Sequence, residues 1–433
     1  MGNTITKCCE KLFSKPQNSF EKLSSLRKIE ISEISKNNTI EKRIPLIEIK
    51  EKENENINNS KNEYQSKQFT HKVTLNDFKI LKTLGKGAFG KVLLVYNEEL
   101  NKYFAMKILK KDFIKKNKQI AHTKIERKIL EKINYPFISQ LIYAFQNKEK
   151  LYMITEYMGG GELFYHLHNE NYFKESKAKL YICEIILAIE HLHKNNIIYR
   201  DLKPENILLD ESGHIKLTDF GLSKILNDIN KDKTYTICVT PEYVAPEVLT
   251  GKGYNKSVDW WSLGIILYEM LCGYSPFREA RNNIDIEIYF KPLFHDCLIS
   301  DDAFDLITKL IEPNQEKRLG YGILDSEEIK NHFFFKNINW QKVERKEYLP
   351  EYVPKLKKDG DVSNFDKMFT DMDPFSYKDK GKLVNHLGKI GKSPAEGVSY
   401  ENFTYVKNVI RFILVFFSFF IRFINYLFGF LFF

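Results

Sequence analysis

An α+β fold is predicted for the central part of this 433-residue chain. The first observation is a glycine-rich turn at residues 85–90 that lies between two apolar runs, 78–84 and 92–96, a pattern typical of two strands joined by a turn. The second is a further strand-like run at 103–108, which is followed by a helical segment around 122–127. Both strands and helices are therefore expected in this part of the chain.

The glycine-rich turn contains Gly85, Gly87 and Gly90. Glycine lacks a Cβ, so the backbone amides of such a turn can approach phosphate groups closely. The same spacing occurs in dinucleotide-binding folds, where the turn opens a helix. Here the turn leads into a second strand-like run, which favours a loop that covers the phosphates of ATP.

Lys107 lies in the third strand-like run and has apolar neighbours on both sides. A single lysine in a strand is usually a solvated surface group. The apolar neighbours favour the alternative, in which the ammonium group faces a nucleotide site and pairs with phosphate.

The strongest chemical signal is a pair of motifs, Tyr-Arg-Asp-Leu-Lys-Pro-Glu-Asn at 199–206 and Asp-Phe-Gly at 219–221. Transfer of a phosphoryl group requires alignment and charge neutralisation more than covalent help. Asp201 can accept the proton of an attacking hydroxyl, and Lys203 can neutralise charge on the moving phosphoryl group. Asn206 and Asp219 offer the oxygen ligands that Mg²⁺ prefers.

Together these motifs resemble those of eukaryotic protein kinases, and residues 78–335 resemble the AGC group, which includes protein kinases A, B, C and G and ribosomal S6 kinase. The resemblance implies a bilobal protein kinase fold, with a small β-rich N-lobe, a larger helical C-lobe and an AGC-type C-terminal extension. It also implies transfer of the γ-phosphoryl group of ATP, with Mg²⁺, to serine or threonine. The motifs typical of the group are Tyr-Arg-Asp in place of His-Arg-Asp at 199–201, and the segments 236–247, 259–264 and 317–320. One departure is Val239, where the group usually has glycine.

The family layout assigns further roles by position. Glu126 is expected to form an ion pair with Lys107, and Thr155 stands where the group usually has a larger Met or Leu. A small side chain there is expected to open a back pocket to bulky inhibitors, or else simply fills core space. Residues implied to contact ATP are Gly85, Gly87, Ala88, Phe89, Gly90, Val92, Ala105, Lys107, Glu126, Thr155, Glu156, Met158 and Glu162. Residues implied to be structural are Glu247 and Arg318, as an ion pair, and Asp259, which caps the catalytic-loop backbone.

Activation is expected through phosphorylation of Thr236 by an upstream kinase. The added phosphate can order a loop by pairing with cations, and the residues that match the family's phosphate pocket are His122, Arg200 and Lys224. In the alternative interpretation Thr236 is an ordinary loop threonine.

Substrate preference follows from acidic residues. Glu162, Glu205 and Glu269 match positions that hold arginines upstream of the acceptor, and arginine pairs strongly with carboxylates. We therefore expect protein substrates with basic residues before Ser or Thr. Thr240 is implied to contact Asp201 and Lys203 and to favour serine or threonine substrates. The residues implied to form an apolar pocket for the residue after the acceptor are Ile237, Pro241 and Val244.

The C-terminal extension departs from the family pattern because it is short. Residues 364–369 resemble the tail that crosses the ATP site, with Phe365 expected to touch the adenine. Residues 372–377 resemble the hydrophobic motif, with Ser376 as its regulatory site. Only five residues separate Phe369 from Phe375, so this motif is not expected to reach the usual N-lobe pocket easily.

The chain ends predict membrane attachment. Met-Gly-Asn-Thr-Ile-Thr at the start fits N-myristoylation of Gly2, and Cys8 and Cys9 are placed for palmitoylation. A second acyl chain makes anchoring stable. Residues 409–433 are almost all Phe, Ile and Leu, with polar residues on one helical stripe. They fit a membrane span, an interfacial helix, or a gene-model artefact.

The predicted organisation has six parts: an acylation segment (1–9), a flexible basic and polar arm (10–77), the kinase domain (78–335), a shortened AGC extension (336–377), a linker (378–408) and a hydrophobic C-terminal segment (409–433). Composition agrees with a cytoplasmic, membrane-associated enzyme. The formal charge of +9 favours anionic lipid but is too diffuse for nucleic acid. Six cysteines show no disulfide framework. The alternatives are a pseudokinase scaffold, which the complete set of catalytic residues disfavours, and a purely structural membrane protein.

Overall fold

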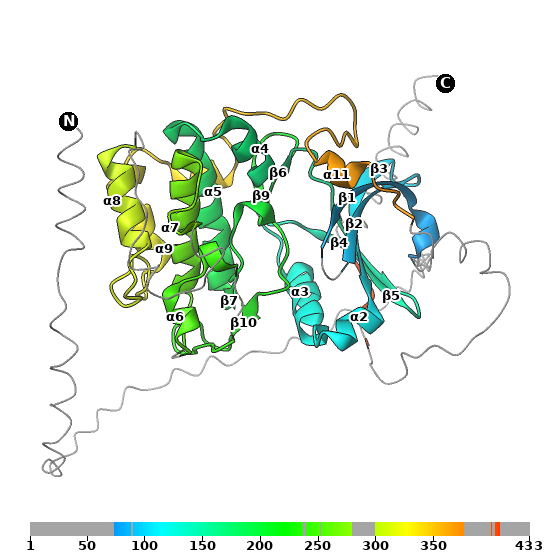
Figure 1. The fold of residues 1–433 in the computed structure, drawn as a ribbon, viewed down its shortest axis with the longest axis horizontal. Helices are drawn as coiled ribbons and strands as arrows, with labels where there is room; N and C mark the ends of the chain where they lie inside the picture. The colour runs from blue at the N-terminus through cyan, green and yellow to red at the C-terminus, as the bar shows by residue number, and fades with distance from the viewer. Residues whose placement is uncertain are drawn as a thin grey trace, which may run out of the picture. The chain divides into compact units, whose positions relative to one another are not determined.

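The computed structural model describes residues 73–87, 90–236, 240–251, 253–278, 299–375, 400 and 403–407. All of them belong to one of the chain's two compact units, residues 72–433. Several predicted features lie outside the described residues: Gly2, Cys8, Cys9, Ala88, Phe89, Ile237, Ser376 and the segment 409–433. The predicted α+β fold with two lobes is confirmed (Figure 1).

The N-terminal lobe is built on a six-stranded antiparallel sheet with the strand order β1-β2-β3-β5-β4-β11. Successive residues of a strand point to opposite faces of the sheet. In β3, Phe104, Met106 and Ile108 are therefore buried in an aromatic core with Phe78 and Phe145. The strands are β1 (Lys79–Lys86), β2 (Gly90–Asn97), β3 (Lys102–Lys110), β4 (Leu141–Gln146), β5 (Lys150–Glu156) and β11 (Tyr405–Val406), preceded by the 3₁₀ turn η1 (Leu75–Asp77).

Two helices follow β3 and complete this lobe: α2 (Lys111–Lys116) and α3 (Ile120–Lys132). In α3 the buried residues Thr123, Glu126 and Leu130 are spaced by three and four, which places them on one helical face. That face turns toward the cleft between the lobes, so the one acidic residue among them faces the site.

The C-terminal lobe is helical and is organised around α7, which is buried along nearly its whole length. A helix that is apolar all round belongs in a core, and α7 packs against α5 and α8. It ends at Gly273, whose φ of 85° is the left-handed conformation that glycine adopts without strain. The helices are α4 (Leu163–Glu170), α5 (Glu175–Lys194), α6 (Pro246–Leu249), α7 (Ser257–Cys272), α8 (Asp301–Leu310), α9 (Ser326–Lys330) and α10 (Trp340–Glu344), with the 3₁₀ turns η3 (Pro241–Tyr243) and η6 (Phe333–Phe335).

Two small sheets hold the loops at the cleft. One has the order β6-β8-β9 and the other pairs β10 with β7. Because β7 ends and β8 begins on either side of residues 199–206, this segment is held at both of its ends. The strands are β6 (Gly161–Glu162), β7 (Ile197–Ile198), β8 (Ile207–Leu209), β9 (Ile215–Leu217) and β10 (Lys224–Ile225), and the 3₁₀ turn η2 (Pro204–Asn206) lies within the held segment.

The C-terminal extension returns to the N-terminal lobe and packs on β1 through α11 (Lys367–Thr370). Beyond α11, Thr83 Oγ1 donates to the carbonyl of Met372 at 3.5 Å, and Lys91 Nζ hydrogen-bonds the carbonyl of Pro374. The segment at 372–375 therefore lies on β1 and β2.

Part of the range predicted as a linker, 378–408, is instead an edge strand. Tyr405 pairs with Ala144 and Val406 with Tyr143, so β11 extends the sheet beside β4. Tyr400 and Phe403 are buried in the core. The linker prediction is thus wrong for β11, because sequence spacing does not reveal its pairing with the distant strand β4. Among the described residues, no helix combines the length and apolar composition needed to cross a bilayer.

Candidate active site

The cleft between the lobes holds a cavity of about 570 Å³. The sheet of the N-terminal lobe supplies its roof, the chain between β5 and α4 its rear edge, and residues 201–222 its floor. The structure brings together here all the described residues predicted to contact ATP, which are Gly85, Gly87, Gly90, Val92, Ala105, Lys107, Glu126, Thr155, Glu156, Met158 and Glu162. The predicted catalytic and metal-binding residues line the same cavity: Asp201, Lys203, Asn206 and Asp219.

A three-residue charge cluster links the two lobes at the back of the cleft. Lys107 Nζ lies 2.6 Å from Glu126 Oε1 and 3.2 Å from Asp219 Oδ1. Burial disfavours the ammonium form, but Asp219 and Glu126 outweigh it and raise the pKa of Lys107. Lys107 in turn holds the pKa of Asp219 below its ordinary value. The cluster therefore carries a fixed lysine cation and an ionised aspartate at neutral pH.

Two polar side chains converge on one carboxylate oxygen of Asp201, the predicted base. Lys203 Nζ donates to Asp201 Oδ1 at 3.0 Å, and Thr240 Oγ1 donates to the same oxygen, also at 3.0 Å. Lys203 also lies 3.2 Å from Thr240 Oγ1. Burial raises the pKa of Asp201, although Lys203 partly offsets this effect. A carboxylate that is harder to keep ionised is a better proton acceptor, which suits general base catalysis.

The backbone of this loop is fixed by Asp259, at the start of α7. Its carboxylate accepts hydrogen bonds from the backbone N–H of Tyr199 at 2.9 Å and of Arg200 at 2.8 Å. Arg200 has φ 69° and Asp219 has φ 53°, a left-handed conformation that is unfavourable for residues with a Cβ. Strain of this kind persists only where the surroundings impose it and is concentrated at functional sites.

The predicted metal ligands fit a divalent cation. Asn206 Nδ2 donates to the carbonyl and carboxylate of Asp201, at 2.8 and 2.7 Å. Because its nitrogen is engaged there, the amide oxygen is the atom of Asn206 that can bind a cation. Asp219 is ionised and its side chain is half-exposed, so both residues offer the hard oxygen atoms that Mg²⁺ binds.

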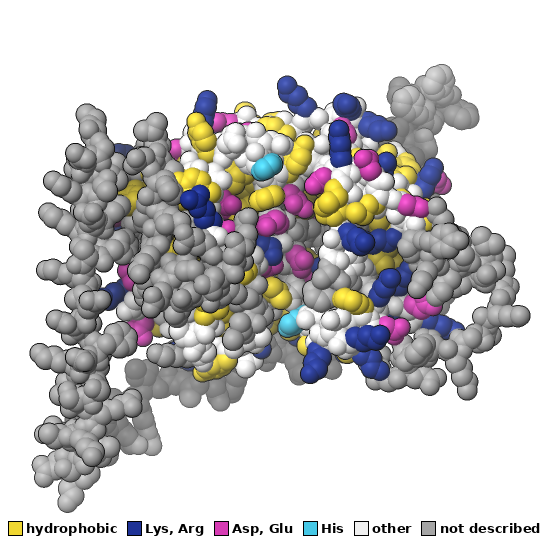
Figure 2. Space-filling model, in the orientation of Figure 1, with side chains coloured by type: hydrophobic (Ala, Val, Ile, Leu, Met, Phe, Trp, Pro, Cys, Tyr) yellow, Lys and Arg dark blue, Asp and Glu magenta, His cyan; other side chains and the backbone are white. Residues whose placement is uncertain are grey.

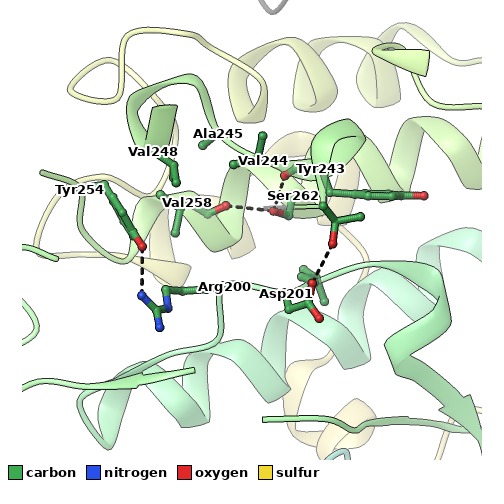
Figure 3. Close-up of a pocket in the computed structure, with 11 residues that line it drawn as sticks. Arg200, Asp201, Tyr243, Val244, Ala245, Val248, Tyr254, Val258 and Ser262 are labelled. Carbon is green, nitrogen blue, oxygen red and sulfur yellow. Dashed lines mark hydrogen bonds between the residues drawn. The ribbon is translucent and has the colours of Figure 1, made fainter. Parts of the chain in front are cut away.

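A cationic cluster lies beneath Thr236, the predicted phosphorylation site. Arg200 and Lys224 both lower the pKa of His122, after the larger effect of burial, so the three predicted phosphate-binding residues are close in space. Tyr254 extends the cluster, because Arg200 Nη1 donates to its hydroxyl at 3.0 Å (Figure 3). The same hydroxyl donates to the carbonyl of Thr236 at 2.6 Å.

Two of the three predicted substrate-binding glutamates meet at the mouth of the cleft. Burial, Glu205 and Asp366 together raise the pKa of Glu162 to about 7. Glu205 is half-buried, and its Oε2 atom is buried without a hydrogen-bond partner among the described residues. The third, Glu269, lines a separate cavity of about 290 Å³ beside Tyr172 and accepts a hydrogen bond from the Tyr243 hydroxyl at 2.6 Å.

A small cavity lies beside Asp201, where an apolar pocket was predicted for the substrate residue that follows the phosphoacceptor (Figure 3). Val244 lines it, together with Ala245, Val248 and Val258. Pro241 is not among its lining residues, and Ile237 lies outside the described residues.

The predicted ion pair between Arg318 and Glu247 is present, and Phe365 lies in the cleft. Arg318 makes a bidentate ion pair with Glu247, with nitrogen–oxygen distances of 2.5 and 2.9 Å, and both residues are buried. Phe365 lines the cleft and stacks on Tyr157 with ring centroids 5.9 Å apart.

Sequence reasoning missed Tyr254 and the segment from Tyr400 to Tyr405. Tyr254 carries no chemical signature of its own, since a tyrosine 18 residues from Thr236 contacts it only after folding. The second segment did carry a signal. Its sequence, Tyr-Glu-Asn-Phe-Thr-Tyr, repeats the aromatic spacing that was matched to 372–377. Arg127 of α3 donates to the carbonyl of Phe403 at 2.9 Å, so this segment supports the helix that carries Glu126.

Comparison with known proteins agrees with this geometry. A family model described as the protein kinase domain matches residues 78–335. Protein kinase 2 of Dictyostelium discoideum is 46% identical over 339 residues, which cover 78% of this chain and 69% of that protein. The RAC family serine/threonine-protein kinase homolog of the same organism is 44% identical over 342 residues, covering 78% and 73%. Ribosomal protein S6 kinase beta of Caenorhabditis elegans is 48% identical over 335 residues, covering 76% and 60%.

Proposed function

This chain belongs to the protein kinase family and is a serine/threonine kinase of the AGC group, and on that premise we propose that it phosphorylates Ser or Thr in basic sequence contexts at a membrane surface. The observation that carries the substrate preference is the buried Oε2 atom of Glu205, which has no hydrogen-bond partner among the described residues. An unpaired buried carboxylate oxygen is costly. A substrate arginine would satisfy it and would pair with Glu162 nearby.

Phosphoryl transfer follows from the residues on the cleft floor. The substrate hydroxyl attacks the γ-phosphorus, the bond from that phosphorus to the β–γ bridging oxygen breaks, and the hydroxyl proton passes to Asp201. Thr240 and Lys203 orient the Asp201 carboxylate through hydrogen bonds of 3.0 Å. Lys203 also places a positive charge where the transferred group gains negative charge.

ATP is proposed to lie under the N-terminal sheet, with its phosphates at Gly85 and Gly87 and at Lys107. Glu126 keeps Lys107 charged and in place. Asn206 and Asp219 would hold Mg²⁺, which would neutralise phosphate charge. Phe365 and Met158 line the cavity where the adenine would fit.

Control by an upstream kinase is proposed to act at Thr236. Its side chain is exposed, and its carbonyl already reaches Arg200 through the Tyr254 hydroxyl. A phosphate adds about −2 charge at neutral pH. Next to Arg200, His122 and Lys224 it would tie the activation segment to α3 and to the catalytic loop.

Membrane attachment is proposed through acylation of Gly2 and of the adjacent Cys8 and Cys9. The support is the sequence pattern at the start of the chain. One myristoyl chain gives only marginal membrane binding, and a second acyl chain makes the attachment stable. Such a kinase would act on substrates at the cytoplasmic face of a membrane.

The substrate preference is tested with arrays of peptides in which each position around a Ser or Thr is varied. We expect selection for arginine upstream of the acceptor, with kcat/KM lowered at least tenfold when those arginines become alanine. Glu205→Gln should weaken this selection without changing the KM for ATP. Selection for acidic or proline-containing peptides would reject the proposal.

A further inference from the structure

A basic surface covers the two helices of the N-terminal lobe. Residues 110–132 contain nine Lys or Arg and three Asp or Glu, so this stretch has a formal charge of +6, against +9 for the whole chain. We call its exposed lysines the α2–α3 basic face. They are Lys110, Lys115, Lys116, Lys118, Lys124, Lys128 and Lys132.

The charge of this face is not neutralised within the described part of the chain. None of its seven lysines takes part in an ion pair between described residues, whereas Glu126 pairs with Lys107 and Glu131 with Arg127. Figure 2 shows dark-blue lysine and arginine side chains along the edge of the lobe where Figure 1 places α2.

The last described residues of the chain lie against the same face. Lys111 Nζ lies 5.2 Å and Lys124 Nζ 6.0 Å from the centre of the Tyr400 ring. The backbone N–H of Lys407 donates to the carbonyl of Ile142 at 3.0 Å. The chain is therefore fixed to this lobe up to Lys407.

The position of Lys407 matters because the apolar sequence begins two residues later, at Val409. Two residues span at most about 7 Å of extended chain. Any bilayer that takes up the residues from 409 onward must therefore come close to the edge of the sheet where β11 pairs with β4. That edge adjoins α3, which carries Lys124 and Lys128.

We propose that the α2–α3 basic face binds an anionic phospholipid bilayer and that this contact orients the kinase domain on the membrane. The inference rests on the membrane attachment in the proposed function. It adds which surface of the kinase domain contacts the membrane and that the lipids there are anionic. Lysines close to an anionic membrane surface are each worth about 1 kcal/mol. An acidic protein or a nucleic acid would use the same charge but would give no role to the apolar sequence after Lys407, so we favour the bilayer.

The test measures binding of the full-length, N-myristoylated protein to vesicles of phosphatidylcholine alone and of phosphatidylcholine with phosphatidylserine. The variant Lys115→Gln/Lys116→Gln/Lys118→Gln removes three charges from the face. The matched control, Lys174→Gln/Lys317→Gln/Lys342→Gln, removes three exposed charges from the C-terminal lobe. We expect the first variant to bind phosphatidylserine vesicles at least about tenfold more weakly than the control, and phosphatidylcholine vesicles equally well.

Each other outcome has a definite meaning. Equal losses in both triple variants would show that net charge alone matters and would overturn the inference. If the triple variant of the basic face binds vesicles like the wild type while Gly2→Ala does not bind, the inference is also overturned. Acylation would then account for membrane attachment, and the basic face would be assigned to a protein or nucleic acid partner. Failure of the wild-type protein to bind either vesicle would reject the membrane part of the proposed function and the inference with it. Peptide phosphorylation in solution, measured on the same samples, reports separately on catalysis and folding.

Discussion

Arg200 and Tyr254 are joined by a hydrogen bond of 3.0 Å from Nη1 to the tyrosine hydroxyl, and that hydroxyl donates in turn to the carbonyl of Thr236. The catalytic loop and the activation segment are thereby connected through one buried side chain. The connection exists before any phosphate is added to Thr236. Tyr254 also pairs through its backbone with Thr234, and this short antiparallel bridge helps to position the tyrosine hydroxyl beside the catalytic loop.

Tyr254→Phe should lower kcat about tenfold, because a hydrogen bond to a charged group contributes about 1.5–3 kcal/mol. The KM for ATP should stay unchanged, since Tyr254 does not line the nucleotide cavity. Steady-state kinetics with a basic peptide measures both values. Tyr268→Phe is the matched control, because it removes a hydroxyl from another buried tyrosine, one that meets Tyr274 instead. Equal effects of the two substitutions would contradict the positioning role.

The dependence of peptide phosphorylation on pH should follow Glu162, whose pKa is raised to about 7. The carboxyl is neutral below this value and charged above it, so kcat/KM for arginine-containing peptides should rise as the pH increases through about 7. Glu162→Gln should remove that rise. A peptide with citrulline in place of arginine serves as the control, and an equally steep rise with it would refute the assignment.

Arg318→Met should lower the free energy of unfolding by about 3–5 kcal/mol, since it leaves the buried Glu247 without its partner. The double variant Glu247→Met/Arg318→Met should lose much less, because apolar side chains can replace a buried ion pair. Urea denaturation of the two variants and the wild type gives the values. A double variant that is less stable than Arg318→Met would show that the ion pair itself stabilises the fold, and that the loss in the single variant does not come from leaving Glu247 buried without a partner.

Phe403→Ala should release the segment 403–407 from α3 and β4, since removing a buried phenylalanine costs about 3–5 kcal/mol. Faster amide hydrogen exchange is expected in 141–146, because β4 loses the partner strand that Tyr405 and Val406 provide. Lower kcat is expected as well, since Arg127 of α3 would lose its hydrogen bond to the Phe403 carbonyl and Glu126 is on the same helix. Val406→Ala, at a half-exposed position of the same strand, should change both measurements little. Unchanged exchange in Phe403→Ala would show that β11 is held independently of this side chain.

The local sequence determined much of the cleft. The glycine turn, Lys107 and the motifs at 199–206 and 219–221 identify their chemistry through residue type and spacing, because the groups that act together there are close along the chain or lie on elements of strong periodicity. The pairing of Lys107 with Glu126 needed the family layout, since strand and helix are 19 residues apart.

Tertiary structure alone decided what happens between distant segments. Nothing in the sequence near Glu269 separates it from Glu162 and Glu205, yet packing against Tyr243 places it on another cavity. Two stretches, 372–377 and 400–405, carry nearly the same aromatic spacing, and only the strand pairing of Tyr405 with Ala144 shows which of them reaches α3 and β4. The reason is physical. The type of a residue determines which interactions it can make. Which of these interactions form depends on its burial, on the charged residues near it and on the sheet edges open for pairing, and all three are set by the whole fold.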